Sequence, residues 1–353
     1  MKEKREKLEN QVIASRKEIR TDRMDMSFGE IMNMYDEGEI IISPDFQRAF
    51  RWDKGMQTRF IESLLLGIPI PPIFVAETGE NIWELVDGLQ RLSTILSFFG
   101  KLKDKKKNNL VLTEASILTE LEGFTIDTIP MNFKLLLKRA VCRVEVIRFD
   151  SEFDMRYELF NRLNTGGEQL SQQEIRNCIF RTYDNTFNQF IQDMSRKDFF
   201  TKIIILRRED KEKMLAQELV LRFFTLKNFG TMFDKNIQRH MDQYMLGVSK
   251  GTITFDYDNE KNIFKRTCDV IKKLDKNVFK LSTLNFSTSM YDALMINIAL
   301  NLDICENYTA EELLSRIDSL KRDGEFRKNT NSASSSKYRI SSKIDIAHKF
   351  LVG

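Results

Sequence analysis

Histidine is scarce in this sequence. Among 353 residues only His240 and His348 occur, and they lie far apart along the chain. Hydrolases that bind a metal through several histidines need more imidazole groups than this, and most Ser-His-Asp hydrolases need a better placed one. Tryptophan and proline are also rare, with 2 and 5 residues against 27 phenylalanines and 15 methionines. We therefore expect a core of plain aromatic rings and thioethers, and we exclude chemistry based on clustered histidines.

Closely spaced cysteines and long apolar runs are absent as well. The four cysteines form no Cys-X-X-Cys motif; they are Cys142, Cys178, Cys268 and Cys305. Such spacing is typical of buried thiols in a reducing compartment. No apolar run reaches the 18 residues of a membrane span, and the charged N-terminus lacks the apolar segment of a signal peptide. We expect a cytoplasmic protein with no membrane partner.

Charge is nearly balanced, with 55 basic against 52 acidic side chains and a net charge of +3. A binder that relies wholly on electrostatic attraction to nucleic acid needs a larger excess. Two segments are nevertheless locally basic: five lysines lie within residues 101–107, and basic side chains recur over residues 316–343. Each segment is compatible with a solvated surface or with a phosphate-rich partner.

The length and the hydrophobic patterning predict an α+β protein with two domains. Residues 1–24 resemble a charged helical arm. Residues 25–150 combine strand-like and helix-like patterns, including a hairpin over 73–77 and 82–86. From residue 151 to residue 353 the periodicity is helical almost throughout. We therefore expect a small mixed α/β domain followed by an all-helical domain.

Three polar clusters lie beside the predicted ends of these elements. The first, over residues 44–52, places Gln47 and Arg48 among three aromatic residues. The third, over residues 160–171, crowds amides, an arginine and a threonine around the turn at Gly166 and Gly167. An anchored surface loop and an ordinary helix end are the simpler interpretations of these two clusters.

The second cluster, Asp87-Gly88-Leu89-Gln90-Arg91, follows a predicted strand and opens a predicted helix. A junction of this kind exposes backbone N–H groups and the positive end of a helix dipole, which together favour phosphate. A cation such as Arg91 is unfavourable at that end of a helix unless an anion is bound there. The pattern therefore indicates an anion site.

Four blocks of the sequence together resemble the N-terminal domain family of GmrSD-type restriction endonucleases. The blocks are PDFQRAFRW, IESLLLGIPIPPIFV, ELVDGLQRLSTILSFF and FNRLNTGGEQLSQQEIRN. The resemblance implies a ParB/sulfiredoxin-like fold for residues 25–150, with a helical domain behind it and a nucleotide-binding cleft between the motifs. In relatives, the corresponding block binds and hydrolyses nucleoside triphosphates; in this sequence it is Asp87-Gly88-Leu89-Gln90-Arg91.

The resemblance also implies which residues act. Asp87, Gln90 and Arg91 are the expected catalytic residues, with Gln90 positioning water and Asp87 orienting Arg91 or a Mg²⁺ ion. The expected nucleotide-binding residues are Gln47, Arg48, Gly88, Arg91, Asn161, Arg162, Asn164 and Thr165. No separate metal site is expected. Leu89 replaces the glutamine of the common motif, so binding is more strongly implied than hydrolysis.

The resulting hypothesis is an NTP-binding sensor or regulatory protein of a DNA restriction or anti-phage defence system. Because no histidine-rich HNH block is present, we expect a separate nuclease subunit to cut the DNA, and self-association is compatible with the sequence. One alternative is a nucleic-acid-binding module without nucleotide turnover. Another is a nuclease whose metal is held by carboxylates alone.

Overall fold

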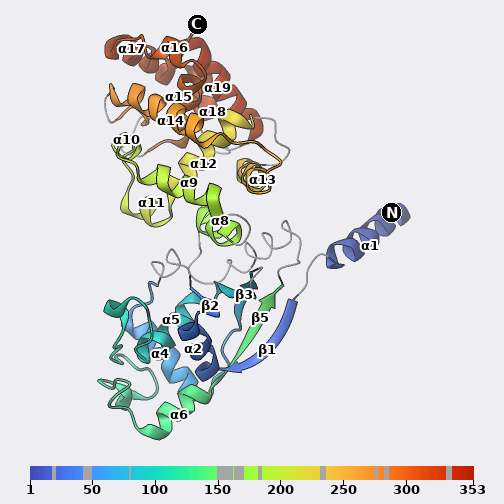
Figure 1. Ribbon diagram of the computed structural model, residues 1–353, viewed down its shortest axis with the longest axis vertical. Helices are drawn as coiled ribbons and strands as arrows, with labels where there is room; N and C mark the ends of the chain where they lie inside the picture. The colour runs from blue at the N-terminus through green and yellow to red at the C-terminus, as the bar shows by residue number, and fades with distance from the viewer. Residues whose placement is uncertain are drawn as a thin grey trace. The chain divides into compact units, whose positions relative to one another are not determined.

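The computed structural model divides into two compact units, Met1–Gln169 (unit 1) and Leu170–Gly353 (unit 2). It describes residues 1–17, 21–42, 50–78, 81–148, 162, 171–181, 185–230, 236–274, 277–281, 286–330 and 336–353. The predicted boundary between residues 150 and 151 lies outside the described residues. Unit 1 is mixed and unit 2 is helical where described, which confirms the predicted α+β class (Figure 1).

Unit 1 contains a five-stranded mixed sheet with the strand order β1-β5-β3-β4-β2. The strands are β1 Thr21–Ser27, β2 Ile40–Ile41, β3 Ile73–Glu77, β4 Trp83–Asp87 and β5 Val141–Ile147. The pairs β1·β5 and β3·β4 are antiparallel, whereas β3·β5 and β2·β4 are parallel. The pairing of β3 with β4 confirms the predicted hairpin.

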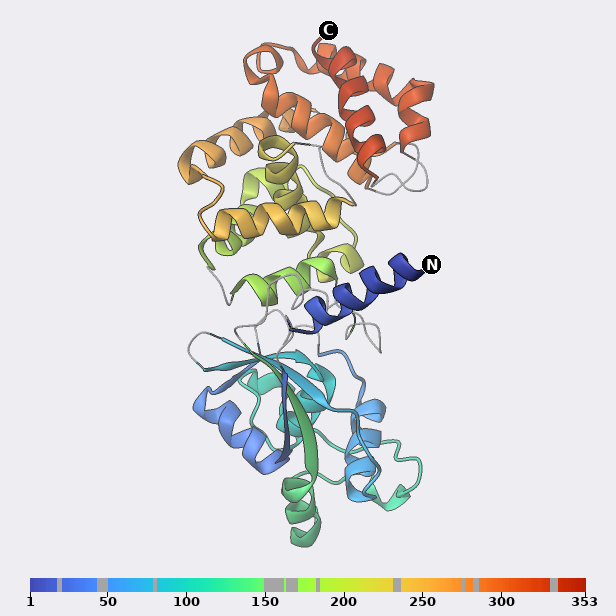
Figure 2. The ribbon, with the colours of Figure 1, turned by 90° about the vertical axis from the view of Figure 1, so that its right-hand side faces the viewer.

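Unit 1 also contains several helices. They are α1 Lys2–Lys17, α2 Phe28–Glu37, α4 Lys54–Leu65, α5 Leu89–Phe98 and α6 Met131–Arg139, with 3₁₀ turns η1 Lys105–Lys107 and η2 Thr119–Leu121. Figure 2 shows α6 leading directly into β5. The start of α5 immediately after β4 confirms the predicted sequence of strand, glycine and helix.

Local capping explains where several helices begin. The Ser27 hydroxyl accepts the Glu30 N–H at 3.1 Å, and α2 then ends at Gly38 with a φ of +85°. The Asp53 carboxylate likewise accepts the Met56 N–H at 2.8 Å. These caps satisfy N–H groups that have no partner within the helix. Each of these helix ends depends only on residues a few positions apart in the sequence.

The strand β1 begins at Thr21, within the segment 1–24 that resembles a charged helical arm in the sequence. Its residues are mostly polar and exposed, so they lack the apolar alternation of a recognisable strand. It is held as an edge strand by pairing with β5 and by two ion pairs across that ladder. These are Asp25 with Arg143 at 3.0 Å, and Glu145 with Arg23 at 3.0 Å.

Unit 2 consists of helices in the part of the chain that is described. They are α8 Gln172–Arg181, α9 Asn185–Arg196, α10 Asp198–Thr201, α11 Arg208–Glu212, α12 Leu215–Asn228, α13 Ile237–Ser249, α14 Tyr257–Lys272, α15 Thr288–Leu300, α16 Leu302–Cys305, α17 Ala310–Arg322, α18 Gly324–Asn329 and α19 Lys337–Leu351. The helices α11 and α12 are separated at Met214, which has a φ of +58°. No described helix is both long and apolar enough to cross a membrane.

Candidate functional site

The turn between β4 and α5 can be made only by glycine. Gly88 has a φ of +93°, a left-handed conformation that side chains disfavour. A Cβ atom added at residue 88 would lie 2.5 Å from Cγ2 of Ile73, so any side chain at this position would collide with strand β3. Gly88 is the N-cap residue of α5, and no side chain caps that helix. The first turn of α5 therefore depends on other groups for its exposed N–H donors.

Arg91 joins the end of β4 to the segment that precedes β3. Its Nη2 donates to Oδ2 of Asp87 at 2.8 Å, and its Nη1 donates to the carbonyl of Pro72 at 3.0 Å and to that of Pro71. The Arg91 side chain is 12% exposed and the Asp87 side chain 34%. The guanidinium thus has protein partners on two sides, while the carboxylate keeps access to water.

Gln90 attaches the end of the first polar cluster to the same helix terminus. Its Oε1 accepts the backbone N–H groups of Arg51 and Trp52, each at 3.1 Å. The carbonyl of Trp52 in turn accepts Nε2 of Gln57 at 2.7 Å, and the indole packs against Phe60 with ring centroids 5.9 Å apart. The side chain of Arg51 is exposed. Gln90 therefore positions an exposed arginine beside the start of α5.

Leu89 is 7% exposed and belongs to the core of unit 1. At this position the chain presents an apolar side chain to its own interior. A glutamine here would have to bury an amide or leave the core. Leu89, which stands in place of the glutamine of the common motif, thus has a packing role.

The structure brings together four of the predicted site residues: Asp87, Gly88, Gln90 and Arg91. Five others lie outside the described residues, namely Gln47, Arg48, Asn161, Asn164 and Thr165. Arg162 is described and is exposed. Sequence reasoning missed the contributions of Arg51, Trp52, Pro71 and Pro72. These four residues contribute backbone N–H or carbonyl groups, and Arg51 also contributes an exposed side chain. Residue type alone does not identify such contributions.

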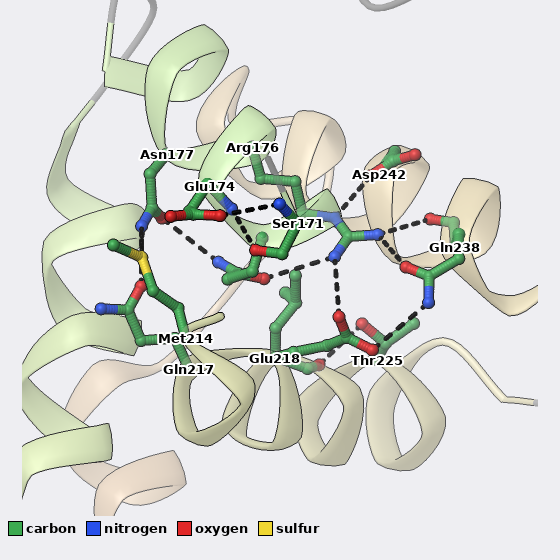
Figure 3. Close-up of polar contacts among 12 residues, drawn as sticks. Ser171, Glu174, Arg176, Asn177, Met214, Gln217, Glu218, Thr225, Gln238 and Asp242 are labelled. Atoms are coloured by element: carbon green, nitrogen blue, oxygen red, sulfur yellow. Dashed lines mark hydrogen bonds and ion pairs between the residues drawn. The ribbon is translucent and has the colours of Figure 1, made fainter. Parts of the chain in front are cut away.

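The last residues of the fourth block are buried in unit 2, where they form the polar network drawn in Figure 3. Arg176 is fully buried and donates through Nε to Oδ1 of Asp242 at 2.6 Å. Its other nitrogens donate to Oε1 of Gln173 at 3.3 Å and to the carbonyl of Gln238 at 3.2 Å. This network fastens α8 to α13. The polar residues after Ser171 therefore hold the helical unit together.

Ser171 and Glu174 form a capping box at the start of α8. The Ser171 N–H donates to Oε2 of Glu174 at 2.7 Å, and the Glu174 N–H donates to the Ser171 hydroxyl at 3.2 Å. The corresponding pair of Thr309 and Glu312 caps α17 in the same way. In both boxes the hydroxyl residue and the glutamate are three positions apart, the spacing by which a capping box is recognised in a sequence.

The described residues show few groups suited to metal or thiol chemistry. Among them, no cluster of three or more His, Cys, Asp or Glu side chains could hold a metal ion. Cys142, Cys268 and Cys305 are buried free thiols, and burial raises the pKa of each. Burial also lowers the pKa of His240, whose Nε2 lies 2.9 Å from the carbonyl of Gly230. These groups serve packing in both units.

The fold and this junction define a small mixed-sheet domain with its candidate site at a strand–glycine–helix turn. Residues 28–181 match the family model of the GmrSD restriction endonuclease, N-terminal domain. The match covers a little under half of the chain, and it confirms the resemblance seen in the sequence. No curated protein and no solved structure gave a significant match.

Proposed function

We propose that this protein is an NTP-binding regulatory component of a DNA restriction or anti-phage defence system. In this proposal the triphosphate binds at the N-terminus of α5. The supporting observation is the junction at Gly88, where a helix without a side-chain cap starts beside Arg51, Asp87 and Arg91. A domain of the GmrSD restriction endonuclease family surrounds that junction.

The proposed contacts follow from charge and exposure. Backbone N–H groups in the first turn of α5 would bind phosphate oxygens, assisted by the positive end of the helix dipole. Arg51 would supply the neutralising cation, because its side chain is exposed while its backbone is held by Gln90. Asp87 has a partly exposed carboxylate, which is a suitable ligand for the Mg²⁺ that accompanies a triphosphate. Arg91 would act mainly by positioning Asp87.

Binding is better supported than rapid hydrolysis. Oε1 of Gln90 already accepts two backbone N–H groups, so using that oxygen to hold an attacking water would release Arg51 and Trp52. Leu89 offers no second amide and packs into the core. We therefore propose a bound nucleotide that controls the protein, with DNA cleavage carried out by a separate nuclease subunit.

A nucleotide panel tests this function. ATP, GTP, CTP and UTP, each with Mg²⁺, would be titrated while the melting temperature is recorded. A ligand at 100 times its Kd raises the free energy of unfolding by about 2.7 kcal/mol. We expect at least one nucleotide to stabilise the protein, and we expect Arg51→Ala to weaken that nucleotide about tenfold or more, since it removes a charge-assisted contact.

Arg59→Ala is the matched control, because Arg59 is an exposed arginine on the neighbouring helix α4. It should leave nucleotide affinity unchanged. If no nucleotide stabilises the wild-type protein, or if Arg51→Ala and Arg59→Ala bind it as tightly as wild type does, the proposed site is wrong.

A further inference from the structure

The five lysines predicted to form a basic segment lie in a loop that the structure holds in one shape. We name residues Lys101–Asn108 the lysine loop; its lysines are Lys101, Lys103, Lys105, Lys106 and Lys107, and its one acidic residue is Asp104. Leu102 anchors the loop, since it is only 3% exposed. The loop thus carries mostly positive charges and is anchored in the core by one apolar side chain.

Side chains close the base of the lysine loop. Oδ1 of Asn108 accepts the Leu102 N–H at 3.0 Å, and Nδ2 of Asn108 donates to the Leu102 carbonyl at 3.0 Å. Asp104 caps the 3₁₀ turn by accepting the Lys106 N–H at 3.2 Å, and the Ser97 hydroxyl donates to the Lys107 carbonyl. A loop fixed in this way loses little conformational entropy when it binds a partner.

The lysine ammonium groups have different surroundings. Lys101 pairs with Asp36, and Lys103 lies 5.6 Å above the ring of Tyr35. Lys105 and Lys106 are exposed, and neither forms an ion pair with a residue that the structure describes. Holding like charges close together is unfavourable without a counter-charge. The outer part of the loop therefore presents positive charge to solvent.

The basic residues near the C-terminus behave differently. Arg316 donates to the carbonyl of Phe350 at 3.0 Å, Arg322 to that of Asp318 at 3.1 Å, and Arg327 to that of Lys321 at 2.9 Å. These arginines satisfy carbonyl groups of their own unit, which explains their presence without a ligand. No such internal role accounts for Lys105 and Lys106.

We propose that the lysine loop binds the sugar-phosphate backbone of DNA. This inference builds on the proposed role in a DNA restriction system but assigns a surface that the nucleotide site does not include. Lysine suits phosphate as a mobile point charge, whereas protein interfaces are depleted in lysine and enriched in aromatic residues and arginine. The outer loop residues include no aromatic residue. Nucleic acid is therefore the partner that this composition favours over an acidic protein.

The lysine loop is also continuous with the candidate site. The Lys107 ammonium lies 5.7 Å from the ring centroid of Phe50, the residue before Arg51. A DNA strand contacting the outer lysines would thus run close to the segment that Gln90 holds. Contacts of this kind position a protein on DNA and carry no sequence information by themselves.

The test measures binding of the full-length protein to an unmodified DNA duplex by fluorescence anisotropy over a series of salt concentrations. The variant combines Lys105→Gln with Lys106→Gln. Because each neutralised phosphate contributes about 0.9 to the slope of log K against log salt, we expect the slope to become shallower by about 1.8. The affinity at low salt should fall about tenfold or more. Both positions are exposed, so the melting temperature should not change.

The control combines Lys261→Gln with Lys272→Gln, two exposed lysines of α14. It should match wild type in slope and affinity. The proposal is overturned if wild type does not bind the duplex, if the loop variant keeps the wild-type slope, or if polyglutamate competes as effectively as DNA. Nucleotide titration of the wild-type protein separates the two proposals: if wild type binds a nucleotide but does not bind the duplex, only the DNA-binding proposal fails.

Discussion

Two arginine clusters, one in each unit, differ in how far they are removed from water. In unit 1, Arg91 is 12% exposed and pairs with Asp87, which is 34% exposed. In unit 2, Arg176 is fully buried and pairs with Asp242, which is 5% exposed. Both arginines lie within residues 28–181, which match the family model of the GmrSD restriction endonuclease, N-terminal domain. Residue type alone does not distinguish them.

The difference in exposure separates a candidate ligand site from a structural network. The Asp87–Arg91 pair is partly exposed to solvent, so a ligand can replace water there at a small cost in free energy. In contrast, the partners of Arg176 are buried side chains and a carbonyl on neighbouring helices, and any opening would leave a charge dehydrated. The unit 1 cluster can respond to a ligand, whereas the unit 2 cluster holds helices in place.

The largest expected effect contrasts the two arginines directly. Arg176→Ala would leave Asp242 buried without its cation, which typically lowers the free energy of unfolding by about 3–5 kcal/mol. Arg91→Ala removes hydrogen bonds to two carbonyls and a carboxylate that water can partly replace, so we expect a loss of about 1–3 kcal/mol. Hydrogen exchange resolved by peptide, together with denaturant unfolding, assigns each loss to its unit.

Arg207→Ala is the control, because Arg207 forms an exposed ion pair with Asp210 and its loss should leave the free energy of unfolding nearly unchanged. Equal losses for Arg176→Ala and Arg91→Ala would remove the distinction between the clusters.

A smaller effect sharpens the description of the unit 1 junction. Gly88→Ala and Gly38→Ala both place a side chain at positive φ, with φ values of +93° and +85°. Only the first meets a neighbour, Ile73, because nothing lies within 4 Å of a Cβ at Gly38. We expect Gly88→Ala to be the more destabilising by about 1–3 kcal/mol, the usual range for overpacking. Similar melting temperatures for the two variants would show that the turn has no such steric requirement.

The smallest effect concerns a second buried cation of unit 2. Lys343 is 1% exposed, donates to the Ser289 hydroxyl at 2.9 Å, and has a pKa lowered to about 8, mainly by burial. Asp292 opposes this shift, whereas Arg222 and Arg339 add to it. Because the unfolded chain retains the ordinary pKa of 10.5, it binds more protons than the folded protein between these two values.

Stability should therefore rise with pH as Lys343 loses its proton above about pH 8. Lys343→Met has no proton to lose, so the difference between wild type and this variant should change with pH across that window. Urea unfolding at several pH values measures it. Parallel curves for the two proteins would mean that Lys343 is not held in an unfavourable charged state.

Short-range signals in the sequence determined much of the fold. The caps at Ser27, Asp53 and Thr309, the hairpin after Pro72 and the helix after Gly88 all depend on residues within a few positions of one another. Backbone geometry and neighbouring side chains are sufficient to specify such features. The family resemblance likewise rested on contiguous blocks.

Tertiary structure decided what the polar residues of those blocks do. Arg91 finds its carbonyl partners 19 and 20 residues away, Gln90 holds backbone 38 and 39 residues away, and Arg176 meets its carboxylate 66 residues away. The strand β1 exists because of a partner strand more than 100 residues later. An arginine or glutamine has the same local pattern whether it meets solvent, ligand or a buried acceptor. Only the fold supplies the partner and removes the water, and those two factors set the energy of the contact.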